Sequence, residues 1–171
     1  MKAFLVCLAW VPAALSASAM ELTSPDIKDG APIARAFYYT SCGGQNVAPA
    51  LAWSGAPRGV GSYAVTVIDT SVAPSGWSHW IVVSVPSTVH ALPRGGALPN
   101  GASAVRSNFG DLIYAGPCPP LGTGLHRYAF TVYALPGTAP VLAADAKAMD
   151  VSAALASVAL ATATLTVTAQ Q

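Results

Sequence analysis

The chain has 171 residues, of which 53% are hydrophobic and only 9% are charged. Its 8 Lys and Arg against 7 Asp and Glu give a formal net charge of +1, which excludes the strongly basic surface of a nucleic-acid-binding protein. The high hydrophobic content excludes a disordered chain. The length fits one domain with its own core, and beyond the amino terminus no apolar stretch is long enough to span a bilayer.

The first 19 residues predict an export signal. Lys2 gives a positive start, residues 3–15 form an apolar run, and Ala17 and Ala19 provide the small side chains that a signal peptidase requires. The run is too short for a stable bilayer anchor; a core helix or an uncleaved anchor is the alternative. Cleavage after Ala19 leaves residues 20–171 as a single domain without net formal charge, in the periplasm or secreted.

Export changes the meaning of the cysteines. Cys42 and Cys118 are the two that remain after cleavage, and both lie in segments rich in Gly and Pro. In an oxidising compartment such a pair favours a structural disulfide, which would close a loop of about 75 residues and add roughly 4 kcal/mol. Two free thiols are the alternative. A metal site is not expected, because no Cys or His lies two to four residues from either cysteine, and no cofactor is predicted.

Three apolar runs rich in β-branched and aromatic residues predict strands at 62–69, 79–85 and 128–135, and a proline stops each of the last two. These runs are apolar on both faces, as in strands buried between two layers. Residues 141–159 lack Gly and Pro and are dominated by Ala, which predicts a helix. Alternation over 162–168 predicts a closing strand. The pattern indicates a mainly β, mostly antiparallel domain with one short C-terminal helix.

Polar residues lie at the ends of these predicted strands. Asp69 ends one strand and His79 begins the next, so in a hairpin the two would face each other at its open mouth. His126 opens the third long strand after a glycine-rich turn, whose backbone amides together with an imidazole suit an anion. The alternative is that each histidine simply packs in the core. His90 has no polar neighbours in the sequence and is predicted to lie on a loop surface.

Three segments carry a resemblance to a known family. They are Cys42-Gly-Gly-Gln-Asn-Val-Ala-Pro49, Gly76-Trp-Ser-His-Trp80, and the run from Gly116 to Tyr128, which ends in His-Arg-Tyr. These segments resemble the phosphatidylethanolamine-binding protein family, and within it the bacterial branch often called Raf-kinase-inhibitor-like. The resemblance implies an antiparallel, β-sandwich-like fold with a small pocket for phosphate-type anions. It also implies the pocket residues, which are Asp69, His79, Pro119, Pro120, His126 and Tyr128.

The chain departs from the family at one motif. Where the family has Asp-Pro-Asp-x-Pro, this sequence reads Asp69-Thr-Ser-Val-Ala-Pro74, so the first proline and the second acid are missing. The loss of one carboxylate predicts a less negative pocket that is less selective for an amine-bearing headgroup. It also weakens the case for catalysis.

Three functions follow as hypotheses. The first is a binding protein for a small anionic ligand or a phospholipid headgroup, with binding that strengthens from about pH 8 to about pH 6 as two imidazoles gain protons. The second is an inhibitor or regulator of a protease or another protein. The third is an enzyme in which Asp69 orients His79 as a general base. The enzyme ranks last, because the sequence has no Gly-x-Ser-x-Gly signature and the pair lacks an identifiable third member.

Overall fold

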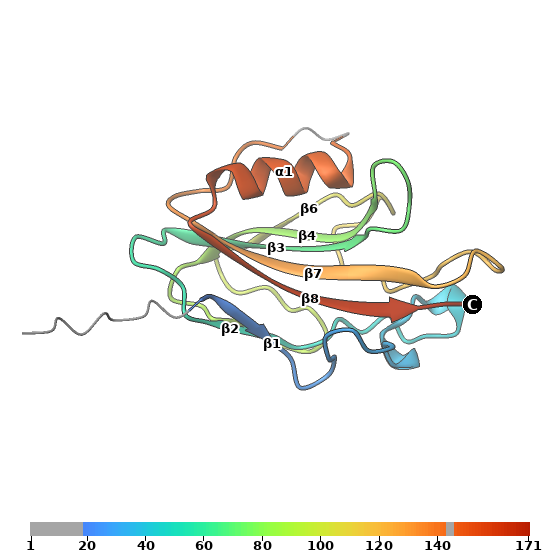
Figure 1. Ribbon diagram of the computed structural model, residues 1–171. Helices are drawn as coiled ribbons and strands as arrows, with labels where there is room; N and C mark the ends of the chain where they lie inside the picture. Colours follow the sequence, from blue (N-terminus) through green and yellow to red (C-terminus); the bar gives the residue numbers. More distant parts are fainter. Residues whose placement is uncertain (1–18, 143–145) are drawn as a thin grey trace, which may run out of the picture.

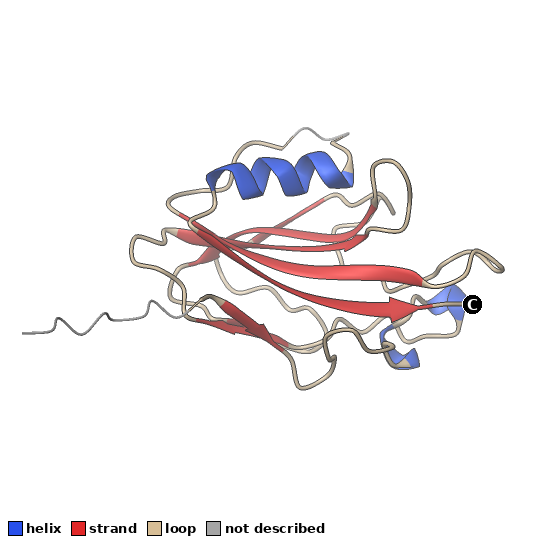
Figure 2. Cartoon of the chain, in the orientation of Figure 1, coloured by secondary structure: helices blue, strands red, loops and turns tan. Residues whose placement is uncertain are grey.

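The computed structural model describes residues 19–142 and 146–171, and antiparallel strands dominate this part of the chain (Figures 1 and 2). One sheet has five strands in the order β6-β4-β3-β7-β8, and the other has three in the order β1-β2-β5. The predicted signal peptide lies almost wholly outside the described residues. The bounds are β1 (Glu21–Thr23), β2 (Leu51–Ser54), β3 (Ser62–Asp69), β4 (Trp77–Pro86), β5 (Ala91–Leu92), β6 (Ser103–Val105), β7 (His126–Leu135) and β8 (Ala161–Ala169).

Strand β3 lies at the centre of the large sheet, and all eight of its residues are buried. One face, with Tyr63, Val65 and Val67, belongs to the main core between the two sheets. The other face, with Ala64, belongs to a second cluster that includes Leu155 of the helix. Burial on both faces explains the continuous apolar run in the sequence, so the prediction of strands buried between layers is confirmed.

The single α-helix of the described residues, α1 (Ala148–Val158), covers the outer face of the large sheet (Figure 1). Its buried residues are Ala148, Val151 and Leu155, spaced three and four apart as one face of a helix requires. No helix among the described residues is long and apolar enough to cross a membrane.

The predicted helix over 141–159 was too long. Val141 and Leu142 are not helical, residues 143–145 lie outside the described part, and the helix begins at Ala148. An alanine-rich sequence favours a helix without fixing its start. Here the start coincides with the first residue that the sheet buries, and the backbone N–H of Met149 donates to the carbonyl oxygen of Ser75 at 3.0 Å.

The predicted disulfide is present. Cys42 and Cys118 are bonded, with 5.5 Å between their Cα atoms. Cys42 ends a short 3-10 helix (Thr40–Cys42), and nearby the backbone N–H of Tyr39 donates to the carbonyl oxygen of Pro117 at 3.1 Å. Gly116 is required at this junction, because a Cβ there would lie 2.1 Å from the carbonyl oxygen of Phe37.

Removal of the disulfide should destabilise the protein, because it frees two loops that are 76 residues apart in the sequence. We expect Cys42→Ser to lose roughly 2–5 kcal/mol of unfolding free energy and Tm to fall by about 5 to 15 °C. Thermal unfolding under non-reducing conditions measures this. Ser41→Ala, which alters a neighbour of Cys118 without breaking the bond, is the control. An unchanged Tm for Cys42→Ser would mean that packing alone holds these loops.

Candidate functional site

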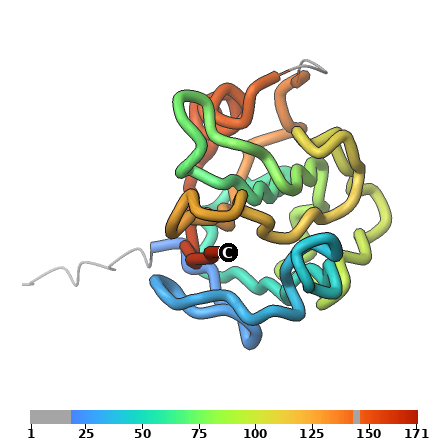
Figure 3. Tube along the Cα trace, turned by 90° about the vertical axis from the view of Figure 1, so that its right-hand side faces the viewer, coloured from blue at the N-terminus to red at the C-terminus, as the bar shows by residue number. Residues whose placement is uncertain are grey.

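A pocket of about 300 Å³ lies at the end of the large sheet where β3 ends and where β4 and β7 begin. Figure 3 looks onto this end of the molecule, with the β3–β4 loop and the loop before β7 toward the viewer. All six residues predicted for the site line this one pocket. Its lining consists of Asp69, Val72, Trp77, His79, Phe109, Cys118, Pro119, Pro120, His126 and Tyr128.

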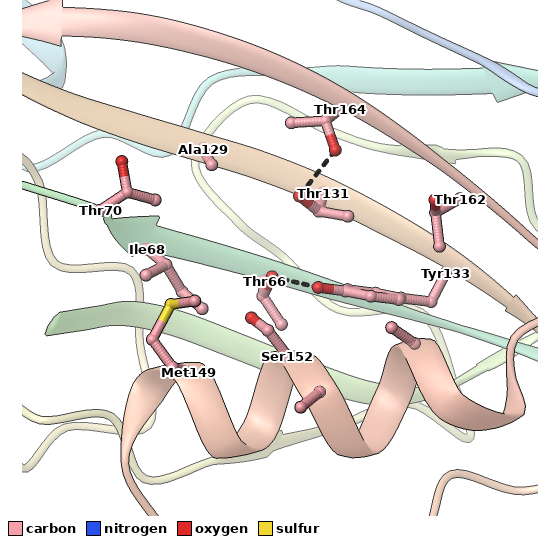
Figure 4. Close-up of a pocket in the computed structure, with 12 residues that line it drawn as sticks. Thr66, Ile68, Thr70, Ala129, Thr131, Tyr133, Met149, Ser152, Thr162 and Thr164 are labelled. Atoms are coloured by element: carbon pink, nitrogen blue, oxygen red, sulfur yellow. Dashed lines mark hydrogen bonds between the residues drawn. The ribbon is translucent and has the colours of Figure 1, made fainter. Parts of the chain in front are cut away.

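A larger cavity, of about 440 Å³, lies between α1 and the outer face of the large sheet (Figure 4). No acidic, basic, histidine or cysteine side chain is among its lining residues. Four of its hydroxyl groups form two pairs, Thr131 with Thr164 at 2.9 Å and Thr66 with Tyr133 at 3.5 Å (Figure 4). The smaller pocket is therefore the candidate site, because it gathers the titratable groups.

His79 occupies a β-bulge. In the ladder between β3 and β4, Val67 pairs with Trp80 and Ile68 with Ser78, so His79 has no partner residue in β3. The segment before Gly116 takes the place of the missing partner. The backbone N–H of Ala115 donates to the His79 carbonyl oxygen at 3.0 Å, and His79 Nδ1 donates to the Ala115 carbonyl oxygen at 2.8 Å. Bulges often redirect a side chain at a functional site in this way.

Asn46 holds this supporting segment in place. Its Nδ2 donates to the carbonyl oxygen of Tyr114 at 2.9 Å, and its Oδ1 accepts the backbone N–H of Gly116 at 2.8 Å. The backbone of Asn46 is left-handed, with φ at 55°, a conformation that Asn adopts more readily than most residues. Asn46 lies in one of the family motifs of the sequence, where its role could not be predicted. Its amide, which bonds both sides of Ala115, positions the carbonyl that orients His79.

The His79 ring is neutral at neutral pH. Burial lowers the pKa of His79 to about 4, although the Ala115 carbonyl and the Asp69 carboxylate act in the opposite direction. The rings of Phe109 and Tyr128 lie 4.9 Å and 5.0 Å from the imidazole. Since Nδ1 carries the proton that Ala115 accepts, Nε2 presents a lone pair. The prediction that two imidazoles gain protons between about pH 8 and about pH 6 therefore does not hold for His79 in the free protein, because desolvation opposes the charge on this ring.

Asp69 is paired with His126, not with His79. His126 Nδ1 donates to Asp69 Oδ2 at 2.6 Å, and the backbone N–H of Ser71 donates to Asp69 Oδ1 at 2.9 Å. Within the hairpin, Asp69 stands opposite Trp77. The predicted Asp69–His79 pair was wrong because two register shifts in the β3–β4 ladder, one between Tyr63 and Val65 and one between Val67 and Ile68, carry Asp69 past His79. The missing second acid of the family motif falls at Ser71, whose hydroxyl accepts the backbone N–H of Arg127 at 2.9 Å.

The second nitrogen of His126 is also occupied. Its Nε2 lies 2.9 Å from the hydroxyl oxygen of Thr123. The backbone amides of the glycine-rich turn around Thr123 were predicted to help to bind an anion. In the structure it is the Thr123 side chain of this turn that contacts His126. Both ring nitrogens of His126 therefore have partners within the protein.

Tyr128 completes the polar lining. Burial raises the pKa of its hydroxyl above the ordinary value, and the Asp69 carboxylate adds to the shift, so the hydroxyl keeps its proton and stays a donor. The other walls are apolar, with Pro119 buried and Trp77 40% exposed at the rim. His90 lies elsewhere, exposed on a loop with its ring beside Tyr63, as predicted for a surface residue.

Comparison with known proteins identifies relatives over most of the chain. The profile of the family described as phosphatidylethanolamine-binding protein matches residues 23–170. The UPF0098 protein YbcL of Escherichia coli is 41% identical over 137 residues, which is 75% of each chain. LppC of Mycobacterium tuberculosis, named as a lipoprotein candidate, is 40% identical over 121 residues, covering 71% of this chain and 58% of its own.

Solved structures agree with this relationship. The crystal structure of E. coli YbcL, described as a new member of the mammalian PEBP family, superposes with a TM-score of 0.82 and 35% identity, covering 90% of this chain and 99% of that one. A candidate phosphatidylethanolamine-binding protein homologue from Chlamydia trachomatis has a TM-score of 0.73 and 31% identity, with coverage of 90% and 98%.

The lowered pKa of His79 predicts a pH dependence of stability. The unfolded chain takes up a proton on this ring near pH 6.5, while the folded protein does so only at about pH 4. Stability should therefore fall as the pH is lowered from about 6.5 to about 4. We expect His79→Gln to remove this component, and the exposed His90→Gln to retain it. Denaturant unfolding across this pH range measures the slope, and an equal slope for wild type and His79→Gln would contradict the buried neutral ring.

Asn46→Gly tests the support of His79. Glycine tolerates the left-handed backbone, so the substitution removes the two side-chain hydrogen bonds without adding strain. We expect a loss of roughly 1 to 3 kcal/mol of unfolding free energy and altered NMR signals of the His79 ring. Gln45→Gly, at the exposed neighbouring position, is the control. Unchanged His79 signals in Asn46→Gly would show that the 114–116 segment is positioned by other contacts.

Proposed function

Because the chain belongs to the phosphatidylethanolamine-binding protein family, we propose that it is an exported binding protein rather than an enzyme. Its ligand is a phosphate-type anion, free or in a phospholipid headgroup, and the form that suits the pocket best carries a P–OH, as inorganic phosphate and a protonated phosphomonoester do. The observation that carries this proposal is the tautomer of the buried His79 ring: Nδ1 donates to the Ala115 carbonyl oxygen, which makes Nε2 a hydrogen-bond acceptor.

The pocket chemistry selects against a fully deprotonated anion. An oxygen lone pair placed against the His79 Nε2 lone pair would be repelled, and the Asp69 carboxylate disfavours further negative charge. A singly protonated phosphate has both kinds of group that the pocket needs. Its P–OH can donate to His79 Nε2, and a charged oxygen can accept from the Tyr128 hydroxyl in place of the Asp69 carboxylate. The uncharged walls formed by Pro119 and Pro120 leave room for an organic substituent.

Export is supported by three separate features. The amino terminus has the charge, apolar run and small residues of a signal peptide. The Cys42–Cys118 disulfide fits an oxidising compartment. One relative, LppC, is named as a lipoprotein candidate. Together they favour a periplasmic or secreted protein. The inhibitor hypothesis stays a prediction from the resemblance alone.

Calorimetric titration with inorganic phosphate and with sulfate between pH 8 and pH 6 tests the proton requirement. Inorganic phosphate carries a P–OH throughout this range, so it should bind at both pH values. The monoester O-phosphorylethanolamine, whose second pKa is about 6, should bind more tightly as the pH falls and its P–OH forms. Sulfate, which carries no proton here, should bind weakly and without pH dependence. O-phosphorylethanolamine distinguishes a headgroup from free phosphate. Equal affinity for sulfate and phosphate would contradict the proposal.

Variants define the binding residues. His79→Ala and Tyr128→Phe should weaken phosphate binding, since each removes one proposed contact, whereas His90→Ala should not. Circular dichroism establishes that each variant is folded. Loss of binding in His90→Ala to the same extent, or release of phosphate from O-phosphorylethanolamine by the wild-type protein, would contradict a binding function at this pocket.

A further inference from the structure

The contacts of His126 leave it no free ring nitrogen for a ligand. Nδ1 is held by Asp69 at 2.6 Å, and Nε2 lies 2.9 Å from the Thr123 hydroxyl oxygen. Yet His126 lines the pocket and is itself buried, at 7% exposure. An anion that is to bond this ring must therefore replace one of the two partners. Asp69 is buried and also holds the Ser71 N–H, so Thr123 is the partner that can be replaced.

The single hydroxyl proton of Thr123 determines the direction of the bond to His126. The Thr123 hydroxyl donates to the carbonyl oxygen of Pro120 at 2.7 Å. When it does so, its oxygen can only accept from His126, and Nε2 is then the donor. In that arrangement an uncharged hydroxyl accepts the hydrogen bond from the ring. An anionic oxygen is a stronger acceptor at the same place.

We propose that Thr123 is a latch on His126, which closes the ring's second nitrogen in the free protein and yields it to a phosphate oxygen on binding. This inference rests on the proposed function, because it concerns the same pocket. It adds a residue that sets affinity without lining the pocket itself.

The loop that carries Thr123 is suited to release it. Among the described residues, the hydrogen bonds of residues 121–125 stay within the loop and Pro120, apart from the contact with His126. Gly122 and Gly124 flank Thr123 with φ of 77° and 84°, so the backbone on each side has a freedom that other residues lack. Leu121 is 82% exposed. Breaking the one hydrogen bond between Thr123 and His126 therefore releases the ring nitrogen without opening the core, while the bond to Pro120 stays within the loop.

Thr123→Val tests the latch, because valine keeps the shape of the side chain but has no hydroxyl. Phosphate no longer has to displace a hydrogen bond, so inorganic phosphate should bind roughly two- to ten-fold more tightly at fixed pH, as expected for one hydrogen bond. Thr123→Ser retains the hydroxyl and should bind as wild type does. Thr138→Val, at an exposed loop position, is the matched control.

Ring ¹⁵N NMR on the ligand-free protein gives a readout independent of binding. Thr123→Val should shift the His126 signals and leave those of His90 unchanged. Unchanged His126 signals, or phosphate affinity that is equal or weaker in Thr123→Val, would overturn the latch while leaving the proposed function standing. If neither the folded wild type nor any folded variant binds phosphate, the proposed function is wrong. The latch proposal is then wrong too, because there is no phosphate binding for Thr123 to control.

Discussion

A buried carboxylate at the end of β3 sets the chemistry of the pocket. Asp69 is only 3% exposed, and an ionised carboxylate at such a place must be hydrogen-bonded or paired. The β3–β7 ladder determines which residue pairs with it. It runs without a shift from Ser62 opposite Leu135 to Asp69 opposite Tyr128. His126, two residues before Tyr128, lies on the same face of β7 and so meets the carboxylate. Asp69 thereby orients His126, whereas His79 is oriented by the Ala115 carbonyl.

His126 and His79 consequently differ in their hydrogen-bonding roles. His126 is oriented by a carboxylate, whereas His79 is oriented by a backbone carbonyl in apolar surroundings, which keep it neutral. Two imidazoles that look equivalent in the sequence thus offer a donor and an acceptor. The pair suits a ligand with both an acidic proton and a negative oxygen better than it suits a simple anion.

The sequence was sufficient to predict the long strands and six residues that line one pocket. Strand β3 was predicted with its observed bounds, since a run buried on both faces is apolar without interruption. Strands of two to four residues, such as β2 and β5, are too short to show a periodic pattern. The site residues were identified by family motifs, but their pairing was not. The β4 bulge that takes His79 out of the ladder cannot be seen in the order of the residues, and neither can the β3–β7 register that brings His126 to Asp69.

The pocket has one fixed side and one side that can be released. On the fixed side, the Ala115 carbonyl holds His79, Asn46 bonds the backbone on both sides of Ala115, and the Cys42–Cys118 disulfide ties the same segment to a distant part of the chain. On the other side, the Thr123 hydroxyl holds His126 from an exposed loop between two glycines. The acceptor, His79 Nε2, is therefore already in place when a ligand binds. The His126 donor becomes available only when Thr123 releases it. The ligand affinity then depends on the difference in free energy between the His126–Thr123 hydrogen bond and the His126–ligand hydrogen bond. Residues in the loop before β7 can change this affinity without altering the pocket lining.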